Sequence, residues 1–198
     1  MGHHLRAFAR HGSNTAMAVG LVGMAAWLAG HASWATPAWI LAGLLVLPVN
    51  EYVFHRFVLH TPPSRIRLVR RFQDVIHYEH HEDLANVARY FTPLWLGIPL
   101  VGAFAILYTL LGLPAVPLLV GNLAGYLYYE WVHYMAHAAY VPRTRLGKFQ
   151  KKYHMWHHHR NEHYWFGVTS PLMDMLAGTY KRLDEVPKSA TAHRLYGP

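Results

Sequence analysis

The chain has 198 residues, which suits a single domain, and 53% of them are hydrophobic while only 14% are charged. In a soluble globular domain about a quarter of the residues are charged, and a disordered chain combines low hydrophobicity with high charge. The composition therefore argues against both classes. Because there is no cysteine, disulfides, thiolate metal sites and a cysteine nucleophile are excluded. The chain has 18 Lys and Arg against 10 Asp and Glu, and such a basic excess suits either a nucleic acid or an anionic membrane face. Because the apolar content is high, we expect the membrane and no nucleic acid as the partner.

Four apolar stretches are long enough to cross a bilayer, which takes about 20 residues in a helix. The first covers residues 13–35 and is rich in small residues that suit close helix contact. The second covers 37–59, where the internal Pro48 predicts a kink. The third and fourth cover 93–113 and 115–139. None of them shows a polar face, so we expect an all-α integral membrane protein with four transmembrane helices in one domain over residues 1–198.

The basic residues predict the orientation of these helices. Two arginines precede the first stretch, six lie at the end of the second or between it and the third, and the remaining ten Lys and Arg follow the fourth. With four crossings all 18 lie on one side, which the positive-inside rule makes cytoplasmic. We therefore expect a multi-pass protein with both termini in the cytoplasm. Segments 60–91 and 140–185 should form a helical cytoplasmic cap.

Many of the 17 histidines fall into four clusters beside this expected cap. The clusters are H-x4-H at His55 and His60, H-x2-HH at His77, His80 and His81, H-x3-H at His133 and His137, and H-x2-HH at His154, His157 and His158. Offsets of three and four lie on one helix face, so three clusters can each present their imidazoles in one direction. The offset of five places two rings about 140° apart on an ideal helix. That pair reaches one centre only with local distortion, or else contacts two metals.

Ten imidazoles converging at one membrane face predict a metal site. Without thiolates the metal must accept nitrogen, with a carboxylate or water beside it, and iron, zinc, copper and nickel all tolerate imidazole. Ten ligands are too many for one octahedral ion, whereas two ions with about five nitrogens each, and a position left open for oxygen or water, fit the count. Metal-bound histidines usually donate their other N–H to a carboxylate or a carbonyl. The carboxylates available for such contacts are Glu51, Glu79, Glu82, Asp83, Glu130 and Asp174, and His163 is a further polar candidate because it lies beside the last cluster.

In this order on a four-helix membrane scaffold, the clusters resemble the fatty acid hydroxylase superfamily, which includes lipid 2-hydroxylases, sterol desaturases and carotenoid ring hydroxylases. The stretch FGVTSPLMDMLAGTY at residues 166–180 is similar to the family's segment after its last histidine box, and the match covers about residues 50–180. The resemblance implies that all ten clustered histidines bind two iron ions. It further implies that this non-haem centre activates O2 and attacks an unactivated C–H bond of a lipid that enters from the bilayer. No catalytic residue beyond the metal centre is assigned.

The resemblance also implies an electron donor. Some eukaryotic members carry a fused cytochrome b5 domain, and no segment of this chain is long enough for one, so we expect a separate donor such as a cytochrome b5-like protein, a ferredoxin or a reductase. The family pattern does not require His159, which we interpret as a neighbour of the ligands. His3, His4, His11, His31 and His193 are interpreted as surface or interfacial groups.

Alternative functions stay open at this point. A lipid or sterol desaturase would use the same two metals to remove two hydrogens instead of inserting oxygen. A membrane metal-binding or transport protein would need ionisable groups inside the spans, which hold almost none. Zinc could stand in for iron in a purified sample, because imidazole sites accept both.

Overall fold

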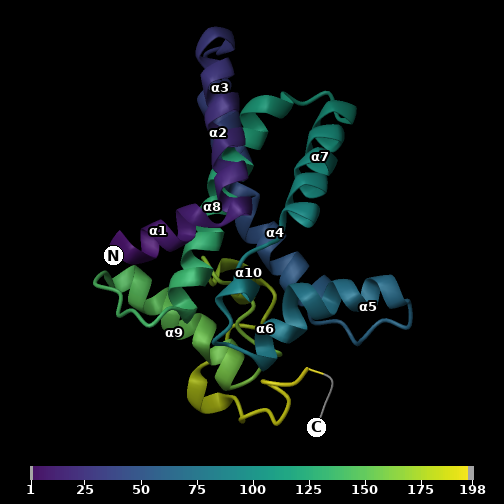
Figure 1. Ribbon diagram of the computed structural model, residues 1–198, viewed down its shortest axis with the longest axis vertical. Coiled ribbons are helices and arrows are strands. Elements are labelled where there is room, and N and C mark those ends of the chain that lie inside the picture. The colour runs from purple at the N-terminus through teal and green to yellow at the C-terminus, as the bar shows by residue number, and fades with distance from the viewer. Residues whose placement is uncertain (1, 196–198) are drawn as a thin grey trace. The chain divides into compact units, whose positions relative to one another are not determined.

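The structure, a computed structural model, describes residues 2–195, and within them every regular element is a helix (Figure 1). The chain divides into two compact units, one made of residues 1–47 and 91–131 and the other of residues 48–90 and 132–198. The prediction of an all-α chain is confirmed for the described residues.

The first unit contains the long apolar helices. They are α2 (Gly12–His31), α3 (Thr36–Leu45), α7 (Leu94–Leu110) and the greater part of α8 (Ala115–His137), and the short α1 (Gly2–Arg10) precedes them. Their bounds follow the four predicted stretches, apart from a break at Val46, after which α4 (Leu47–Phe54) begins. Pro48 stands in the first turn of α4, where its missing N–H is tolerated, and this explains the predicted kink.

Two glycines let α3 and α8 approach closely. A Cβ atom on Gly43 would collide with the backbone of Leu118, and one on Gly121 would collide with the backbone of Ile40 and Leu44. Small residues have this role in membrane helix packing. Asn122 then donates to the Gly43 carbonyl (2.6 Å) and accepts from the Tyr108 hydroxyl (2.7 Å), so that one half-buried amide links three helices.

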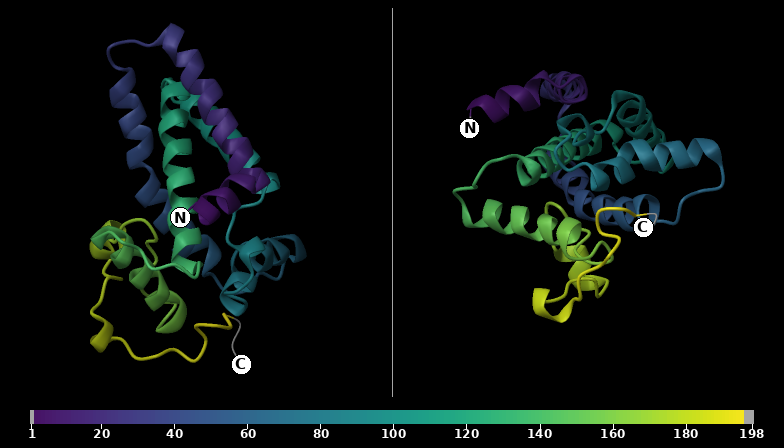
Figure 2. Two further views of the ribbon diagram at one scale, coloured as in Figure 1. Left: turned by 60° about the vertical axis from the view of Figure 1, so that its left-hand side comes forward. Right: turned by 60° about the horizontal axis from the view of Figure 1, so that its bottom comes forward.

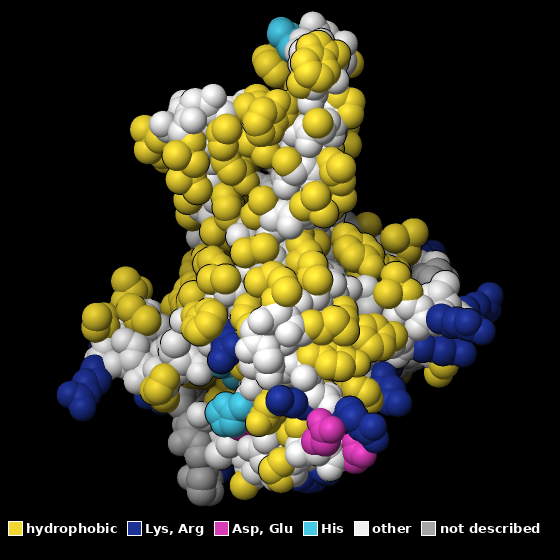
Figure 3. Space-filling model, turned by 180° about the vertical axis from the view of Figure 1, so that it is seen from behind, with side chains coloured by type: hydrophobic (Ala, Val, Ile, Leu, Met, Phe, Trp, Pro, Cys, Tyr) yellow, Lys and Arg dark blue, Asp and Glu magenta, His cyan; other side chains and the backbone are white. Residues whose placement is uncertain are grey.

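The outward side of these helices is apolar, as Figure 3 shows for one face. Exposed side chains include Val22 on α2, Leu45 on α3 and Leu110 on α7, with 68%, 63% and 80% of their surface accessible. By length and composition two helices can cross a membrane, Gly12–His31 and the helical run Thr36–Leu59, and α7 is apolar but 17 residues long. The 23-residue α8 carries Asn122, Glu130 and two histidines, which lower its hydropathy.

The second unit consists of shorter elements (Figure 2). After α4 they are the π-helical turn η1 (His55–Leu59), α5 (Arg67–Gln73), the π-helical turn η2 (Asp74–Tyr78), α6 (Glu79–Glu82) and the 3-10 turn η3 (Val87–Arg89). The end of α8 follows, and then α9 (Arg145–His159), α10 (Leu172–Leu176) and the 3-10 turn η4 (Leu183–Glu185). Tyr153, Trp165 and Val186 form a buried cluster beside α9. All ten clustered histidines belong to this unit.

Candidate metal centre

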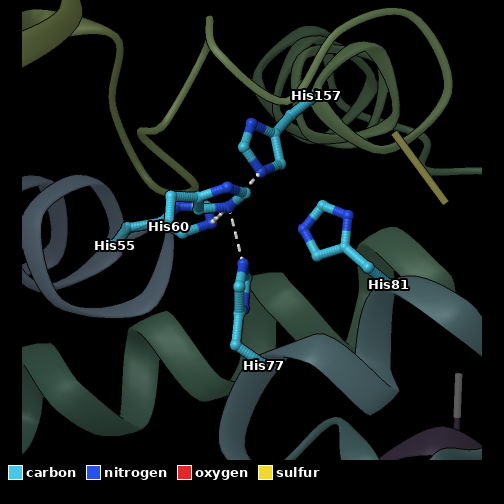
Figure 4. Close-up of side chains that lie close together, drawn as sticks. All are labelled: His55, His60, His77, His81 and His157. Atoms are coloured by element: carbon cyan, nitrogen blue, oxygen red, sulfur yellow. Dashed lines mark hydrogen bonds between the residues drawn. The ribbon is translucent and has the colours of Figure 1, made fainter. Parts of the chain in front are cut away.

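The ten histidines of the four clusters form two groups of five. The first group contains His55, His60, His77, His81 and His157, and the second contains His80, His133, His137, His154 and His158. Within each group the candidate ligand nitrogens all lie within 4.8 Å of one another. Figure 4 shows the five rings of the first group pointing toward one another from three parts of the chain. The groups adjoin, with the ring centroids of His81 and His158 4.1 Å apart.

The division corrects the expectation that each H-x2-HH cluster presents all its rings in one direction. Histidines four residues apart stay together, as His77 and His81 do in one group and His154 and His158 in the other. The middle histidine of each cluster, His80 or His157, joins the opposite group. The reason is helix periodicity: residues i+3 and i+4 are separated by about 100° around the axis, so two groups on adjacent sides of one helix can divide them.

The H-x4-H pair reaches one group through local distortion, one of the two arrangements that its spacing left open. Residues His55–Leu59 form a π turn, and the His60 N–H donates to the His55 carbonyl (3.1 Å), five residues back. A bond of this span brings residue i+5 over residue i, so both rings lie on the same side. Turns of this kind occur frequently at functional sites.

Burial keeps these imidazoles neutral. His80, His81, His154, His157 and His158 are at most 1% exposed. Burial lowers the pKa of His81 from 6.5 to about 3, and it holds the pKa values of His60, His77, His80, His154, His157 and His158 well below the ordinary value. A neutral imidazole is the form that binds metals.

Backbone carbonyls fix the tautomer of four of these rings. The Nδ1 atoms of His55, His81, His133 and His157 lie 2.5, 2.7, 2.9 and 2.8 Å from the carbonyl oxygens of Phe166, Ala192, Tyr90 and Tyr164. A carbonyl only accepts, so each Nδ1 carries the proton and each Nε2 presents a bare lone pair. The Nε2 of His81 is buried without a hydrogen-bond partner among the described residues.

The spacing of the nitrogens fits metal coordination. The Nε2 of His60 lies 2.7 Å from that of His77, 3.0 Å from that of His157 and 3.3 Å from that of His55. In the second group, neighbouring Nε2 atoms lie 2.9–3.1 Å apart. Nitrogens that share an ion at about 2.0–2.1 Å lie roughly 3 Å from their neighbours. One Nε2 proton on His60 can serve only one of its three contacts, so the crowded lone pairs fit a cation better than a hydrogen-bond network.

Two predicted carboxylates act on the loop that anchors His55. Glu51 accepts from the backbone N–H of Val168 and Thr169 and from the Thr169 hydroxyl. The fully buried Asp174 accepts from the backbone N–H groups of Phe166 (2.9 Å) and Gly167 (2.7 Å) and from the Thr179 hydroxyl (2.7 Å). Both carboxylates therefore fix the loop 166–169, whose first carbonyl accepts from His55, and they act on the clustered histidines through that loop.

The residue before this loop has an unusual backbone conformation. Trp165 is fully buried at φ 59°, a left-handed conformation that is rare for a large side chain. Its backbone N–H donates to the Thr179 carbonyl and its indole to the Lys181 carbonyl (3.0 Å), so both ends of the residue are held. Strain of this kind is typical of functional sites.

The other predicted site residues have different surroundings. Glu79 pairs with Arg89, and Glu130, fully buried, accepts from the Thr92 backbone N–H (3.1 Å). The His163 side chain is 72% exposed and lies 3.6 Å from Glu162. His159 lies outside both groups, with its ring 5.0 Å from that of His193. Sequence reasoning missed the four carbonyl anchors, because a backbone carbonyl leaves no residue-type signal.

Comparison with known proteins identifies the family to which these features belong. The sequence profile described as fatty acid hydroxylase matches residues 40–179, which include all ten histidines. The chain belongs to the fatty acid hydroxylase family. The resemblance drawn from the four histidine clusters is thereby confirmed, including the stretch from Phe166 to Thr179.

Several members of the fatty acid hydroxylase family are similar to the chain. A dihydroceramide fatty acyl 2-hydroxylase of Arabidopsis thaliana is 30% identical over 75% of this chain and 62% of its own length. The ceramide very long chain fatty acid hydroxylase of Saccharomyces cerevisiae is 33% identical over 70% of this chain and 36% of its own length. A solved structure of full-length scs7p, with only the hydroxylase domain visible, is 29% identical with a TM-score of 0.78, over 89% of this chain and 68% of that one. The chain thus spans less than two thirds of these two curated relatives.

Proposed function

We propose that this protein is a membrane-embedded oxidoreductase that hydroxylates the acyl chain of a lipid. The observation that carries the proposal is the pair of five-histidine groups, in a chain of the fatty acid hydroxylase family. The similar proteins are named as 2-hydroxylases of dihydroceramide acyl chains and of fatty acids. We therefore take an amide-linked or free fatty acyl chain as the substrate class and its C2 carbon as the reacting position.

The cofactor in this proposal is a pair of iron ions, one in each group. The ligands would be His55, His60, His77, His81 and His157 for one ion and His80, His133, His137, His154 and His158 for the other. Iron bound there would supply the redox chemistry for O2, the co-substrate, whereas zinc, which imidazole also accepts, has none.

The chain's own residues prepare such a centre before any ion binds. Burial keeps the rings neutral, so metal binding does not have to displace many protons. The carbonyls of Phe166, Tyr164 and Ala192 aim the first group, and Glu51 and Asp174 fix the loop behind His55. Ligands held in this way restrict which metal geometries are available.

For the membrane, we propose four crossings by helices α2, α3–α4–η1, α7 and α8, with both termini and the histidines in the cytoplasm. Support comes from the apolar outward side chains of the first unit and from the placement of all 18 Lys and Arg on one side of four crossings. Reporter fusions at both termini test the topology. A periplasmic or lumenal signal from either end would contradict it.

Hydroxylation by O2 places one oxygen atom in the product and the other in water, so two electrons and two protons must be supplied. We propose that a separate carrier delivers these electrons, of the cytochrome b5-like, ferredoxin or reductase type. Purified protein with iron and substrate but no reductant should therefore form no more product than its stored electrons allow.

Lipid mass spectrometry of host cells with and without the gene tests the proposed activity. We expect acyl chains that have gained one oxygen atom, with fragments that place it at C2. Loss of two hydrogens instead would identify a desaturase. If the lipids stay unchanged although the protein holds iron and receives electrons, a metal-binding or transport function would be favoured. The variant His157→Ala, expressed to the same level, is the matched control.

A further inference from the structure

The segment of residues 186–192, here called the strap, lies against the second unit although it forms no regular helix. Both of its ends are buried: Val186 is 2% exposed and Ala192 is 1% exposed. Between them Pro187, Lys188 and Ala190 are exposed to solvent. Val186 packs with Tyr153 and Trp165. An irregular segment that is buried at two separate points must be held there by specific contacts.

The residues directly after α9 provide those contacts. The Arg160 guanidinium donates to the Val186 carbonyl (2.6 Å), and the Asn161 amide donates to the Pro187 carbonyl (3.2 Å). In return the Ser189 backbone N–H donates to the Arg160 carbonyl at the end of α9 (2.8 Å). The strap is therefore attached to the helix that carries His154, His157 and His158.

Glu162 makes the remaining contacts from a buried position. The residue is 2% exposed, and its Oε1 accepts from the hydroxyls of Ser189 (3.0 Å) and Thr191 (2.5 Å). A buried carboxylate is unfavourable unless it is hydrogen-bonded, so these two hydroxyls and the carboxylate require one another. Thr191, which makes the second of these bonds, directly precedes Ala192.

The strap ends on the first histidine group. The Ala192 carbonyl accepts from Nδ1 of His81 (2.7 Å), which leaves Nε2 of His81 as a buried lone pair without a partner among the described residues. Among the described residues, His81 is the one ring of this group whose Nδ1 contacts a residue beyond position 179, where the match to the family profile ends. The other carbonyl anchors of the group come from Phe166 and Tyr164.

We propose that the strap is part of the first metal site and that Glu162 is its positioning residue. Glu162 holds Ser189 and Thr191, these residues place the Ala192 carbonyl, and the carbonyl fixes His81 in the tautomer that binds metal. The inference rests on the proposed function in one respect, because it requires the first group to hold a metal ion. In the second group, the carbonyl that holds Nδ1 of His133 comes from Tyr90 and not from the strap.

The test measures metal release from the full-length protein, loaded with zinc so that no turnover is needed. Wild type should hold close to two equivalents by elemental analysis. In excess chelator, Glu162→Ala should release one equivalent about 10–100-fold faster than wild type and the other at the wild-type rate, since removing an outer partner of a ligand weakens metal affinity by about that factor. Glu162→Gln should fall in between, because its amide oxygen still accepts from both hydroxyls.

Thr191→Val is the milder variant, because it keeps the shape of the side chain and removes one hydrogen bond. It should accelerate the same single equivalent, by less. Lys188→Ala and His193→Ala, which alter exposed side chains on and beside the strap, should leave both rates unchanged. Wild-type rates in Glu162→Ala, or equal acceleration of both equivalents in Thr191→Val, would overturn the proposal. If Glu162→Ala does not fold, Thr191→Val decides. A wild-type protein that binds no metal would instead overturn the proposed centre itself.

Discussion

His80 and His157 each belong to a different group from the other two histidines of their own cluster. Each group contains two pairs, joined across four or five residues, and one single ring: His157 in the first group and His80 in the second. The single rings come from the middle positions of the two H-x2-HH clusters, so each cluster contributes to both groups. Neither group can therefore be completed by one half of the chain alone.

This arrangement predicts selective metal loss. His80→Ala and His157→Ala should each retain close to one of two metal equivalents, because each removes a ligand from a different group and leaves the other group intact. Elemental analysis of the purified variants measures the result, and both should lose hydroxylation. His193→Ala should retain both equivalents and full activity, since its exposed ring lies outside both groups. Full metal content together with full activity in His157→Ala would contradict the assignment.

Asp174 holds the start of the loop behind His55 through the backbone N–H groups of Phe166 and Gly167. In Asp174→Asn one acceptor oxygen becomes a donor that faces the N–H of Phe166 or Gly167, or the Thr179 hydroxyl. We expect a loss of about 1–3 kcal/mol in the free energy of unfolding and faster release of one metal equivalent to a chelator. Asp184→Asn is the matched control, because Asp184 is exposed and pairs with Arg182 in solvent. Equal stability of the two variants would show that the loop does not depend on Asp174.

At the scale of elements, the α3–α8 contact depends on two glycines. Gly121→Val introduces a side chain where even a Cβ atom would meet the backbone of α3. We expect a lower thermal unfolding temperature in detergent, equivalent to about 1–3 kcal/mol or more. Gly20→Ala is the matched control, since its Cβ would meet only the Leu123 side chain at an ordinary 3.9 Å. An unchanged unfolding temperature for Gly121→Val would mean that the helices can separate without loss.

The helices could be predicted from the sequence because long apolar runs and Pro48 carry strong local signals. The π turn at His55–Leu59 could not, since the same five residues also fit an α-helix, and the i→i+5 bond depends on both rings joining the same histidine group. Likewise the ten candidate ligands follow from their spacing, whereas their division into two groups depends on which neighbours pack on each side of α6 and α9. Ala192 gave no signal, because its carbonyl is the functional group.

For the whole molecule, the buried histidines predict acid sensitivity. In the unfolded metal-free chain His81 takes up a proton below pH 6.5, its ordinary pKa, whereas in the folded chain its pKa is about 3. Between these values the unfolded state binds more protons, so the free energy of unfolding falls as the pH falls from 6.5 toward 3. His77, His154 and His158 act in the same direction.

Thermal unfolding of the metal-free protein at pH 7.5, 6.5 and 5.5, values spaced about the ordinary histidine pKa of about 6.5, measures this effect. The unfolding temperature should be lower at pH 5.5 than at pH 6.5, because the unfolded chain gains protons between these two pH values. His193→Ala should show the same dependence, because that ring is exposed in the folded chain. A midpoint that stays constant or rises on acidification would show that the ten rings are not buried and neutral in solution.

The central claim is that the two histidine groups together carry the insertion of oxygen from O2 into a lipid acyl chain. Growth of cells that express the protein under oxygen-18 gas, followed by mass spectrometry of their lipids, tests it most directly. We predict a hydroxyl at C2 that carries oxygen-18 in wild type and is absent from both His80→Ala and His157→Ala. A hydroxyl without the label, or one that persists in either histidine variant, would contradict the account.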